Sequence, residues 1–203
     1  MEHQKYKTCS IFTARFSFMQ ADIQEAVASL ISGKIILYPT DTIWGIGCDA
    51  TNESAVEKIF DIKNRPREKS LIVLVDSVKM LKEFVTITPE MESLLASFQE
   101  SVTVIYPHPK GFAANVVNAD DTIAIRIANH DFCRQLIRQF GKPVVSTSAN
   151  LSGEKSPLSF EDISVCVKDK VDYMVDKQYD TSKYKNPSKL MKLHPDNSME
   201  YLR

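Results

Sequence analysis

Residues 34–42 read Lys34-Ile35-Ile36-Leu37-Tyr38-Pro39-Thr40-Asp41-Thr42. The run from Ile35 to Tyr38 is continuously apolar, which is typical of a strand covered on both faces by other elements. Residues 21–32 carry apolar side chains at helical spacing, and Gly33 stands where a left-handed residue would end that helix. The pattern predicts an amphipathic helix that leads into a central strand, with hydroxyls and a carboxylate at the end of the strand.

The alternation of helix and strand continues along the chain. We expect helices over residues 52–62, from the Thr88-Pro89 cap onward and near residues 131–139, and strands over residues 71–75, 102–106, 122–127 and 143–145. This order predicts an α/β or α+β fold with one twisted sheet. The segment after Asp176 is rich in Lys, Asp, Tyr and Asn, and we expect loops to dominate it.

Length and composition favour a single domain. The 203 residues with 43% hydrophobic content suffice for one core. Residues 1–18 fit less well, since they alternate loosely like an edge strand but equally suit an N-terminal extension with Met19 as the functional start. We therefore assign residues 19–203 to the domain and leave both readings open for residues 1–18.

Charge and cysteine usage exclude several classes of protein. With 25 basic against 26 acidic residues, no global field holds a nucleic-acid backbone, and any such contact needs a local patch. The four cysteines and four histidines are scattered without metal-ligand spacing, so we interpret the cysteines as reduced thiols. No apolar run approaches the ~20 residues that span a bilayer, and no signal-peptide core follows Met1. We expect a soluble, cytoplasmic protein.

A dense cationic segment follows the second predicted helix. It reads Lys63-Asn64-Arg65-Pro66-Arg67-Glu68-Lys69. Pro66 biases Arg65 toward extended geometry, in which alternate residues point to the same side. Lys63, Arg65, Arg67 and Lys69 could then share one face and bind a polyphosphate. The alternative is a solvated surface loop, which such charge runs commonly form.

Polar side chains also gather on three of the predicted strands. Thr40, Asp41 and Thr42 follow the first strand, Ser146 to Asn150 follow the strand at 143–145, and Arg126 lies within the strand 122–127. There Thr122, Ala124 and Arg126 share a face, which suggests a cavity beside the guanidinium. Ligands of open sheets collect at strand ends. The alternatives are an Arg that pairs with a carboxylate and hydroxyls that only cap a turn.

Taken together, these segments resemble the threonylcarbamoyl-AMP synthase family of YrdC-like enzymes. The motifs that carry the resemblance are Tyr38-Pro39-Thr40-Asp41-Thr42 with Gly45 and Gly47, Lys63-x-Arg65-Pro66 with Lys69, the Arg126 strand, and Thr147-Ser148-Ala149-Asn150-Leu151-Ser152-Gly153. Four ordered motifs, spread over roughly residues 21–203, are far more specific than any one of them. The resemblance implies a single YrdC-like domain, with a twisted mixed sheet, flanking helices and a concave cationic cleft.

The resemblance also implies a reaction and its partners. L-threonine, bicarbonate or CO₂, and ATP would give L-threonylcarbamoyladenylate and pyrophosphate, a nucleotidyltransferase reaction. Mg²⁺ would accompany ATP, although no side-chain metal cage is visible and Asp41 is the nearest candidate ligand. A downstream transferase would pass the product to tRNA.

Residue roles follow from the family motifs. Lys63 and Arg65 would be the catalytic residues and would bind the ATP phosphates. The further nucleotide-binding residues would be Lys69, Thr122, Ser148, Asn150, Ser156 and Arg203. Arg126 would pair with the threonine carboxylate. Thr40, the Ser146 backbone and Ser188 would hold the rest of the amino acid.

The chain departs from the family pattern at several positions. Gln99-Glu100-Ser101 replaces a usual Pro-Gly-Pro, and Ser70 replaces a proline. Trp44 replaces a tyrosine, Ala128 a proline and Lys189 a threonine. These changes leave two alternatives open. One is a non-catalytic or altered-specificity relative that binds double-stranded RNA, and the other is a module that transfers the carbamoyl group to an acceptor other than threonine.

Overall fold

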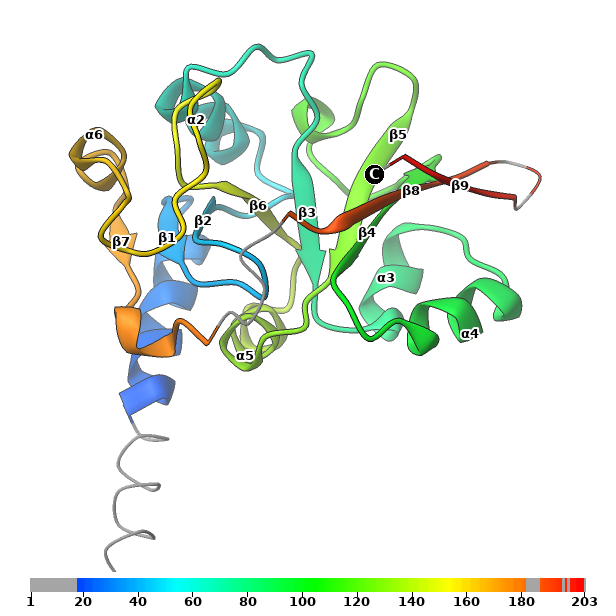
Figure 1. The fold of residues 1–203 in the computed structure, drawn as a ribbon, viewed down its shortest axis with the longest axis horizontal. Coiled ribbons are helices and arrows are strands. Elements are labelled where there is room, and N and C mark those ends of the chain that lie inside the picture. Colours follow the sequence, from blue (N-terminus) through cyan, green and yellow to red (C-terminus); the bar gives the residue numbers. More distant parts are fainter. Residues whose placement is uncertain (1–17, 182–186, 195, 197, 203) are drawn as a thin grey trace, which may run out of the picture.

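One mixed sheet organises the molecule (Figure 1). The computed structural model describes residues 18–181, 187–194, 196 and 198–202. Within these ranges nine strands join in the order β7-β1-β2-β6-β3-β5-β4-β8-β9. The strands are β1 (Ile36–Tyr38), β2 (Gly45–Gly47), β3 (Ile72–Val75), β4 (Val102–Pro107), β5 (Thr122–Ile127), β6 (Val144–Ser148), β7 (Tyr173–Met174), β8 (Lys189–Leu193) and β9 (Met199–Tyr201). Three parallel pairs, β1–β7, β3–β5 and β4–β8, interrupt an otherwise antiparallel sheet, so the predicted mixed α/β class is confirmed.

Helices cover both faces of this sheet. They are a helix over residues 18–31, α2 (Glu53–Lys63), α3 (Val78–Phe84), α4 (Pro89–Ser97), α5 (Asp131–Phe140) and the short α6 (Val165–Lys168), with 3₁₀ turns at Ala114–Val116 and Lys177–Tyr179. The predicted Thr88 cap is confirmed, since its hydroxyl accepts a hydrogen bond from the Met91 amide. Gly33 has a φ of +66°, as expected of a residue that ends a helix in the left-handed region.

Two hydrophobic clusters lie on opposite faces of the sheet. One packs α2, α3 and α4 against one face, and the other packs the helix over residues 18–31 and α5 against the other face. In the first strand Leu37 joins the first cluster, while Ile36 and Tyr38 join the second. The strand is therefore covered on both faces, as predicted. It is not central, because only β7 separates it from the edge of the sheet.

Gly47 allows β2 to lie between β1 and β6. A Cβ atom on Gly47 would stand 2.3 Å from the Val145 carbonyl oxygen and 2.8 Å from the Tyr38 ring. Neither neighbour can retreat, because the carbonyl belongs to the partner strand and Tyr38 is fully buried. Any side chain at Gly47 would push β1 and β6 apart, and these strands carry the loops described below.

Two further expectations from sequence are wrong in this structure. Loops do not dominate the described part of the segment after Asp176, because β8 and β9 form a hairpin there and β8 pairs with β4. The strand predicted at 143–145 continues to Ser148, so Ser146 and Ser148 belong to β6 instead of following it. The proposed edge strand at residues 1–18 lies outside the described residues except for Phe18, which is helical.

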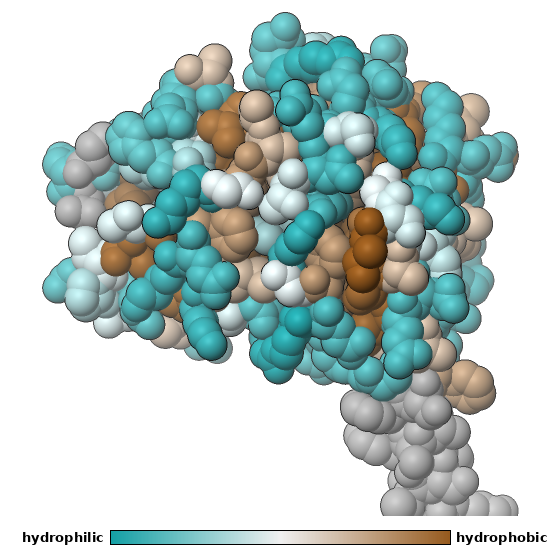
Figure 2. Space-filling view, turned by 180° about the vertical axis from the view of Figure 1, so that it is seen from behind, coloured by the Kyte–Doolittle hydropathy of each residue, from teal (hydrophilic) through white to brown (hydrophobic). Residues whose placement is uncertain are grey.

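One face of the molecule is mostly hydrophilic (Figure 2). The face shown in Figure 2 presents its hydrophobic residues in separate patches between hydrophilic ones. None of the helices in the described part of the chain is long and apolar enough to cross a membrane.

Candidate active site

A polar pocket of about 260 Å³ opens beside the β1–β2 loop. Its walls come from that loop, from β3, β5 and β6, from the turn after α2, and from the segment before β8. The lining residues are Thr40, Thr42, Ile43, Trp44, Gly45, Arg65, Ser70, Ile72, Arg126, Ser146, Thr147, Ser148, Ser156, Pro187 and Ser188. Seven of the residues proposed from sequence are therefore together: Thr40, Arg65, Arg126, Ser146, Ser148, Ser156 and Ser188.

The β1–β2 loop is held by its own hydroxyls. Thr40 Oγ1 donates to the Ile43 carbonyl at 2.7 Å and accepts a hydrogen bond from the Thr42 amide at 3.1 Å. Behind the loop, Cys133 Sγ donates to the Pro39 carbonyl at 3.1 Å. The side chain of Thr40 thus replaces backbone partners that a two-residue turn would have supplied. The result is a fixed loop that presents hydroxyl groups to the pocket.

Arg126 is buried beside Asp41. Arg126 and Asp41 are 4% and 6% exposed, and Arg126 Nη2 lies 3.3 Å from Asp41 Oδ1. Ile123 and Ile125 of the same strand point to the other face of the sheet and join the first hydrophobic cluster, as the alternation in β5 predicted. Arg126 thus both pairs with a carboxylate and lines a cavity, so the two readings from sequence hold together. A guanidinium has five N–H donors, and one carboxylate leaves most of them available.

Lys63 is the last residue of α2 and is 1% exposed. Its Nζ donates to the carbonyl oxygens of Ser148 and Asn150, at 2.5 and 2.6 Å. Burial, and to a lesser extent the positive charge of Arg65, lower the pKa of the Lys63 ammonium to about 8, against a smaller opposing effect of Glu154. Lys63 does not itself line the pocket. It ties the end of α2 to the end of β6, where Ser148 does line it.

The four cations of residues 63–69 do not share one face, so that prediction is wrong. Asn64 ends α2 with a φ of +47°, and this left-handed residue turns the chain before any extended segment begins. Arg65 bends back to donate to the carbonyls of Lys69 and Ser70. Arg67 pairs with Glu57 and Asp61 on the outside of α2. Arg65 alone of the four reaches the pocket lining, and Lys69 lies outside it.

Serines from three separate segments complete the pocket. Ser146 and Ser148 come from β6, Ser156 from the loop after it, and Ser188 from the residue before β8. Ser188 is buried and shares a 2.7 Å hydroxyl–hydroxyl hydrogen bond with Thr103. Because β8 pairs with β4, this contact fixes Ser188 over the pocket.

Some proposed residues lie away from the pocket. The side-chain amide of Asn150 donates to the carbonyls of Leu151 and Glu154, and the backbone carbonyl of Asn150 accepts a hydrogen bond from Lys63 Nζ. Thr122 donates to Asp120 at the start of β5, four residues and about 13 Å along the strand from Arg126. Arg203 lies outside the described residues.

Sequence reasoning did not propose the other eight lining residues as site residues, namely Thr42, Ile43, Trp44, Gly45, Ser70, Ile72, Thr147 and Pro187. Trp44 and Ser70 were noticed only as departures from the family pattern, and Ile72 only as part of a buried strand. Trp44 Nε1 donates to Asp180 at 3.0 Å, and its ring stands edge-on to Phe160 at 5.0 Å between centroids. The signal that could have revealed Trp44 is its place next to the Thr40-Asp41-Thr42 cluster.

Protein ligands for a divalent cation are not apparent in this site. Among the residues that the structure describes, no three His, Cys, Asp or Glu side chains form a group that could hold a metal ion. The candidate from sequence, Asp41, contacts Arg126 and accepts a hydrogen bond from Ser101. The side chains present therefore do not fit a metal cage, and we derive no chemical step from one.

Known proteins share both the sequence and the fold. The family model for Sua5, YciO and YrdC proteins, described as "Telomere recombination", matches residues 28–203. Threonylcarbamoyl-AMP synthase of Pseudoalteromonas translucida is 37% identical over 161 residues, which cover 77% of this chain and 86% of that protein. The protein of the same name from Idiomarina loihiensis is 35% identical over 175 residues, covering 84% and 93%.

Solved structures of related proteins have the same fold as this chain. P. abyssi Sua5 complexed with L-threonine superposes with a TM-score of 0.79 at 28% identity, and the match covers 89% of this chain and 53% of that one. The chain thus spans about half the length of the P. abyssi protein. E. coli YciO, at 21% identity and a TM-score of 0.75, shares the fold. From its matched motifs, its relatives and its fold, this chain belongs to the Sua5/YciO/YrdC family.

Proposed function

We propose that the protein is a threonylcarbamoyl-AMP synthase, which forms L-threonylcarbamoyladenylate and pyrophosphate from L-threonine, bicarbonate or CO₂, and ATP. The observation that carries the proposal is a single pocket that brings Arg126 together with Arg65, Ser148 and Ser188, in a chain related to proteins of that name. The Arg126 guanidinium suits the carboxylate of the amino acid, and the Arg65 guanidinium suits a phosphate of ATP. The P. abyssi relative was solved with L-threonine bound.

The reaction requires no protein nucleophile. The threonine amine attacks CO₂, forms an N–C bond and loses a proton, which gives a carbamate. A carbamate oxygen then attacks the α-phosphorus of ATP, and the bond from that phosphorus to the bridging oxygen of pyrophosphate breaks. The pocket lining consists of hydroxyls, two arginines and small or apolar groups. Such a lining suits catalysis by positioning and by neutralising charge on the phosphates.

We assign the residues as follows. Arg126 pairs with the threonine carboxylate, and Thr40, the Ser146 backbone and Ser188 hold the rest of the amino acid. Arg65, Ser148 and Ser156 bind the nucleotide. Lys63 supports the end of β6 through two carbonyl groups and approaches the phosphates when ATP binds. Lys69, Thr122, Asn150 and Arg203 remain assigned to the nucleotide by the family motifs.

The proposal extends to partners and location. Mg²⁺ arrives with ATP and is held by phosphate oxygens, in keeping with the lack of a carboxylate cluster among the described residues. A downstream transferase passes the threonylcarbamoyl group to tRNA, and the enzyme acts in the cytoplasm, where that tRNA is. The names of the relatives favour the synthase over the RNA-binding alternative.

The deciding experiment is pyrophosphate release from ATP and bicarbonate, with L-threonine, L-serine or no amino acid. We expect release that depends on L-threonine and falls at least tenfold in Arg126→Lys, with Arg134→Lys as the matched control. Arg134 lies on α5, where its guanidinium donates to Ala128 and Asn129. No release from a protein that still binds ATP would refute the synthase. Release that is indifferent to the amino acid would favour a different carbamoyl acceptor.

A further inference from the structure

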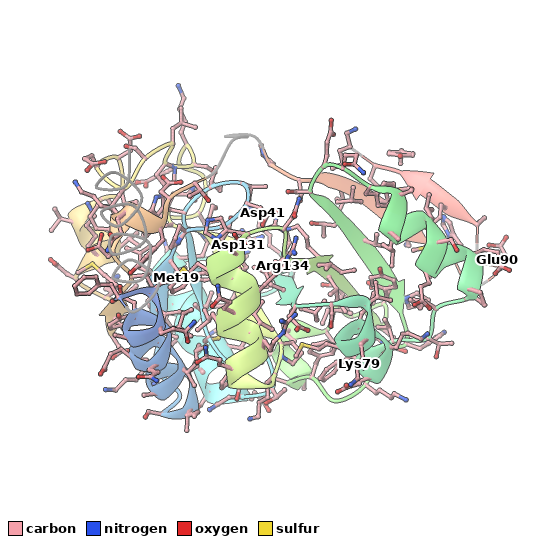
Figure 3. All side chains as sticks on the ribbon, turned by 90° about the horizontal axis from the view of Figure 1, so that it is seen from below. Met19, Asp41, Lys79, Glu90, Asp131 and Arg134 are labelled. Carbon is pink, nitrogen blue, oxygen red and sulfur yellow. The ribbon has the colours of Figure 1, made fainter. Side chains whose placement is uncertain are left out.

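Ser101 contacts the buried pair formed by Asp41 and Arg126. Its hydroxyl donates a hydrogen bond to Asp41 Oδ2, across a sequence separation of 60 residues. Ser101 directly precedes β4, and it belongs to the Gln99-Glu100-Ser101 segment in which the chain departs from its family. Figure 3 shows Asp41 near the start of α5, where Asp131 and Arg134 are labelled. Ser101 thus contacts Asp41, and Asp41 contacts Arg126, which lines the pocket.

The contact changes how Asp41 meets Arg126. A carboxylate beside an arginine commonly forms two parallel hydrogen bonds with the guanidinium. Here one carboxylate oxygen is turned to Ser101, and the other, Oδ1, lies 3.3 Å from Arg126 Nη2 without the alignment of a hydrogen bond. Arg126 Nε is likewise buried without a hydrogen-bond partner among the described residues. Asp41 and Arg126 are therefore within ion-pair distance but form no hydrogen bond with each other.

We propose that Ser101 is a positioning residue, which keeps Asp41 from closing a two-bond pair with Arg126 and so leaves the guanidinium free for the carboxylate of the amino-acid substrate. The identity of that substrate rests on the proposed function. Asp41 and Ser101 do not line the pocket, whereas Arg126 does. Ser101 consequently acts through Asp41 and Arg126.

The position of Ser101 does not depend on its hydroxyl. The Lys189 amide donates to the Ser101 carbonyl at 3.1 Å, and the side chains of Glu100 and Lys189 form an exposed ion pair at 2.7 Å. Both contacts remain when the hydroxyl is removed. In Ser101→Ala we expect Asp41 to lose its second partner and to turn toward the unpaired Nε of Arg126, because a buried carboxylate oxygen without a donor is costly.

Binding measurements test this proposal. In Ser101→Ala we expect the Kd for L-threonine to rise about tenfold, as the loss of one hydrogen bond to a charged group predicts, while the Kd for ATP stays within twofold. Ser101→Thr keeps a hydroxyl and should restore threonine affinity. Ser97→Ala is the control, because Ser97 is exposed and donates only to the Leu94 carbonyl. Equal losses for threonine and ATP, or no loss at all, would overturn the proposal.

A crystal structure of Ser101→Ala gives a readout independent of activity. The expected finding is Asp41 rotated so that both of its oxygens meet Arg126. An unchanged Asp41 would overturn the role of Ser101, whatever the enzyme does. If the wild-type protein neither binds threonine nor releases pyrophosphate, the proposed function fails. The orientation of Asp41 in the two crystal structures would still decide whether Ser101 holds that carboxylate.

Discussion

Lys63 Nζ lies 2.6 Å from the backbone carbonyl oxygen of Asn150. The ammonium is buried at the end of α2 and has a pKa of about 8, well below its ordinary 10.5, chiefly because burial disfavours its charge. A residue from the cationic segment thus holds the serine-rich end of β6 through its backbone. Lys63 can therefore have two separate roles, contact with phosphates and support of the end of β6, and substitution of Lys63 can distinguish them.

The stability of the protein should depend on pH through Lys63. Between pH 8 and about 10.5 the unfolded chain carries the Lys63 proton and the folded chain does not, so the free energy of unfolding rises with pH. The shift corresponds to about 3 kcal/mol in full, of which about 2 kcal/mol falls between pH 8 and pH 10. Urea unfolding at these two pH values measures it. Lys63→Met should lack this rise.

Lys58→Met is the matched control for that experiment. Lys58 lies on the same helix and also donates to a carbonyl, that of Gly33, at 3.0 Å. This variant should keep the rise between pH 8 and pH 10. An equal rise in Lys63→Met would show that another group is responsible.

Arg126→Lys should weaken the binding of L-threonine and leave the binding of ATP nearly unchanged. Lysine keeps the charge beside Asp41 but lacks the planar fork that meets a carboxylate with two hydrogen bonds. We expect the KM for L-threonine to rise roughly ten- to 100-fold and the KM for ATP to stay nearly constant. Steady-state kinetics with each substrate varied in turn measures both. A loss confined to ATP would move Arg126 to the nucleotide side of the pocket.

Ser148→Ala should weaken nucleotide binding without unfolding the protein. Ser148 lines the pocket, and the carbonyl that holds Lys63 belongs to its backbone, so the substitution leaves that contact in place. We expect the Kd for ATP to rise roughly three- to tenfold, the effect of one neutral hydrogen bond. Isothermal titration calorimetry measures it, with Ser93→Ala on α4 as the control. Unchanged ATP affinity would remove Ser148 from the site.

Thiol labelling should report the packing behind the pocket. Cys48 and Cys133 are buried, and burial raises the pKa of both thiols, whereas Cys166 is exposed. In a Cys9→Ser background we expect an aromatic disulfide reagent to label Cys166 rapidly and the other two only after denaturation. Peptide mapping identifies the labelled residues. Rapid labelling of Cys133 would mean that α5 opens away from the Thr40 loop.

The regular elements could be read from the sequence because their hydrophobic spacing coincides with their burial. In α5 the apolar residues recur on one face, and Gly141 ends the helix with a φ of +75°. In the strand 122–127, Ile123 and Ile125 join one hydrophobic cluster and Ala124 and Arg126 do not, as the predicted alternation requires. The same spacing identified Arg126 as a residue beside a cavity. Local pattern and tertiary packing agree in these segments, and this agreement makes them predictable.

The misread segments are those in which a single residue or a distant partner decides the geometry. Asn64 adopts a left-handed conformation that ends α2, and the four cations around it therefore do not share one face. The charge pattern of the sequence does not predict this conformation. The strand β8 has polar residues between its apolar ones and becomes a strand through pairing with β4. The contact between Ser101 and Asp41 spans 60 residues and has no local signature.

The pairing of β8 with β4 has a consequence for synthesis of the protein. Thr40 enters the pocket from the loop after β1, whereas Ser188 enters from the position before β8 and is fixed there by Thr103. A nascent chain can therefore pair β1 to β7 before β8 is available, while its pocket still lacks one wall. Ligands that need that wall cannot select for correct folding until β8 has emerged.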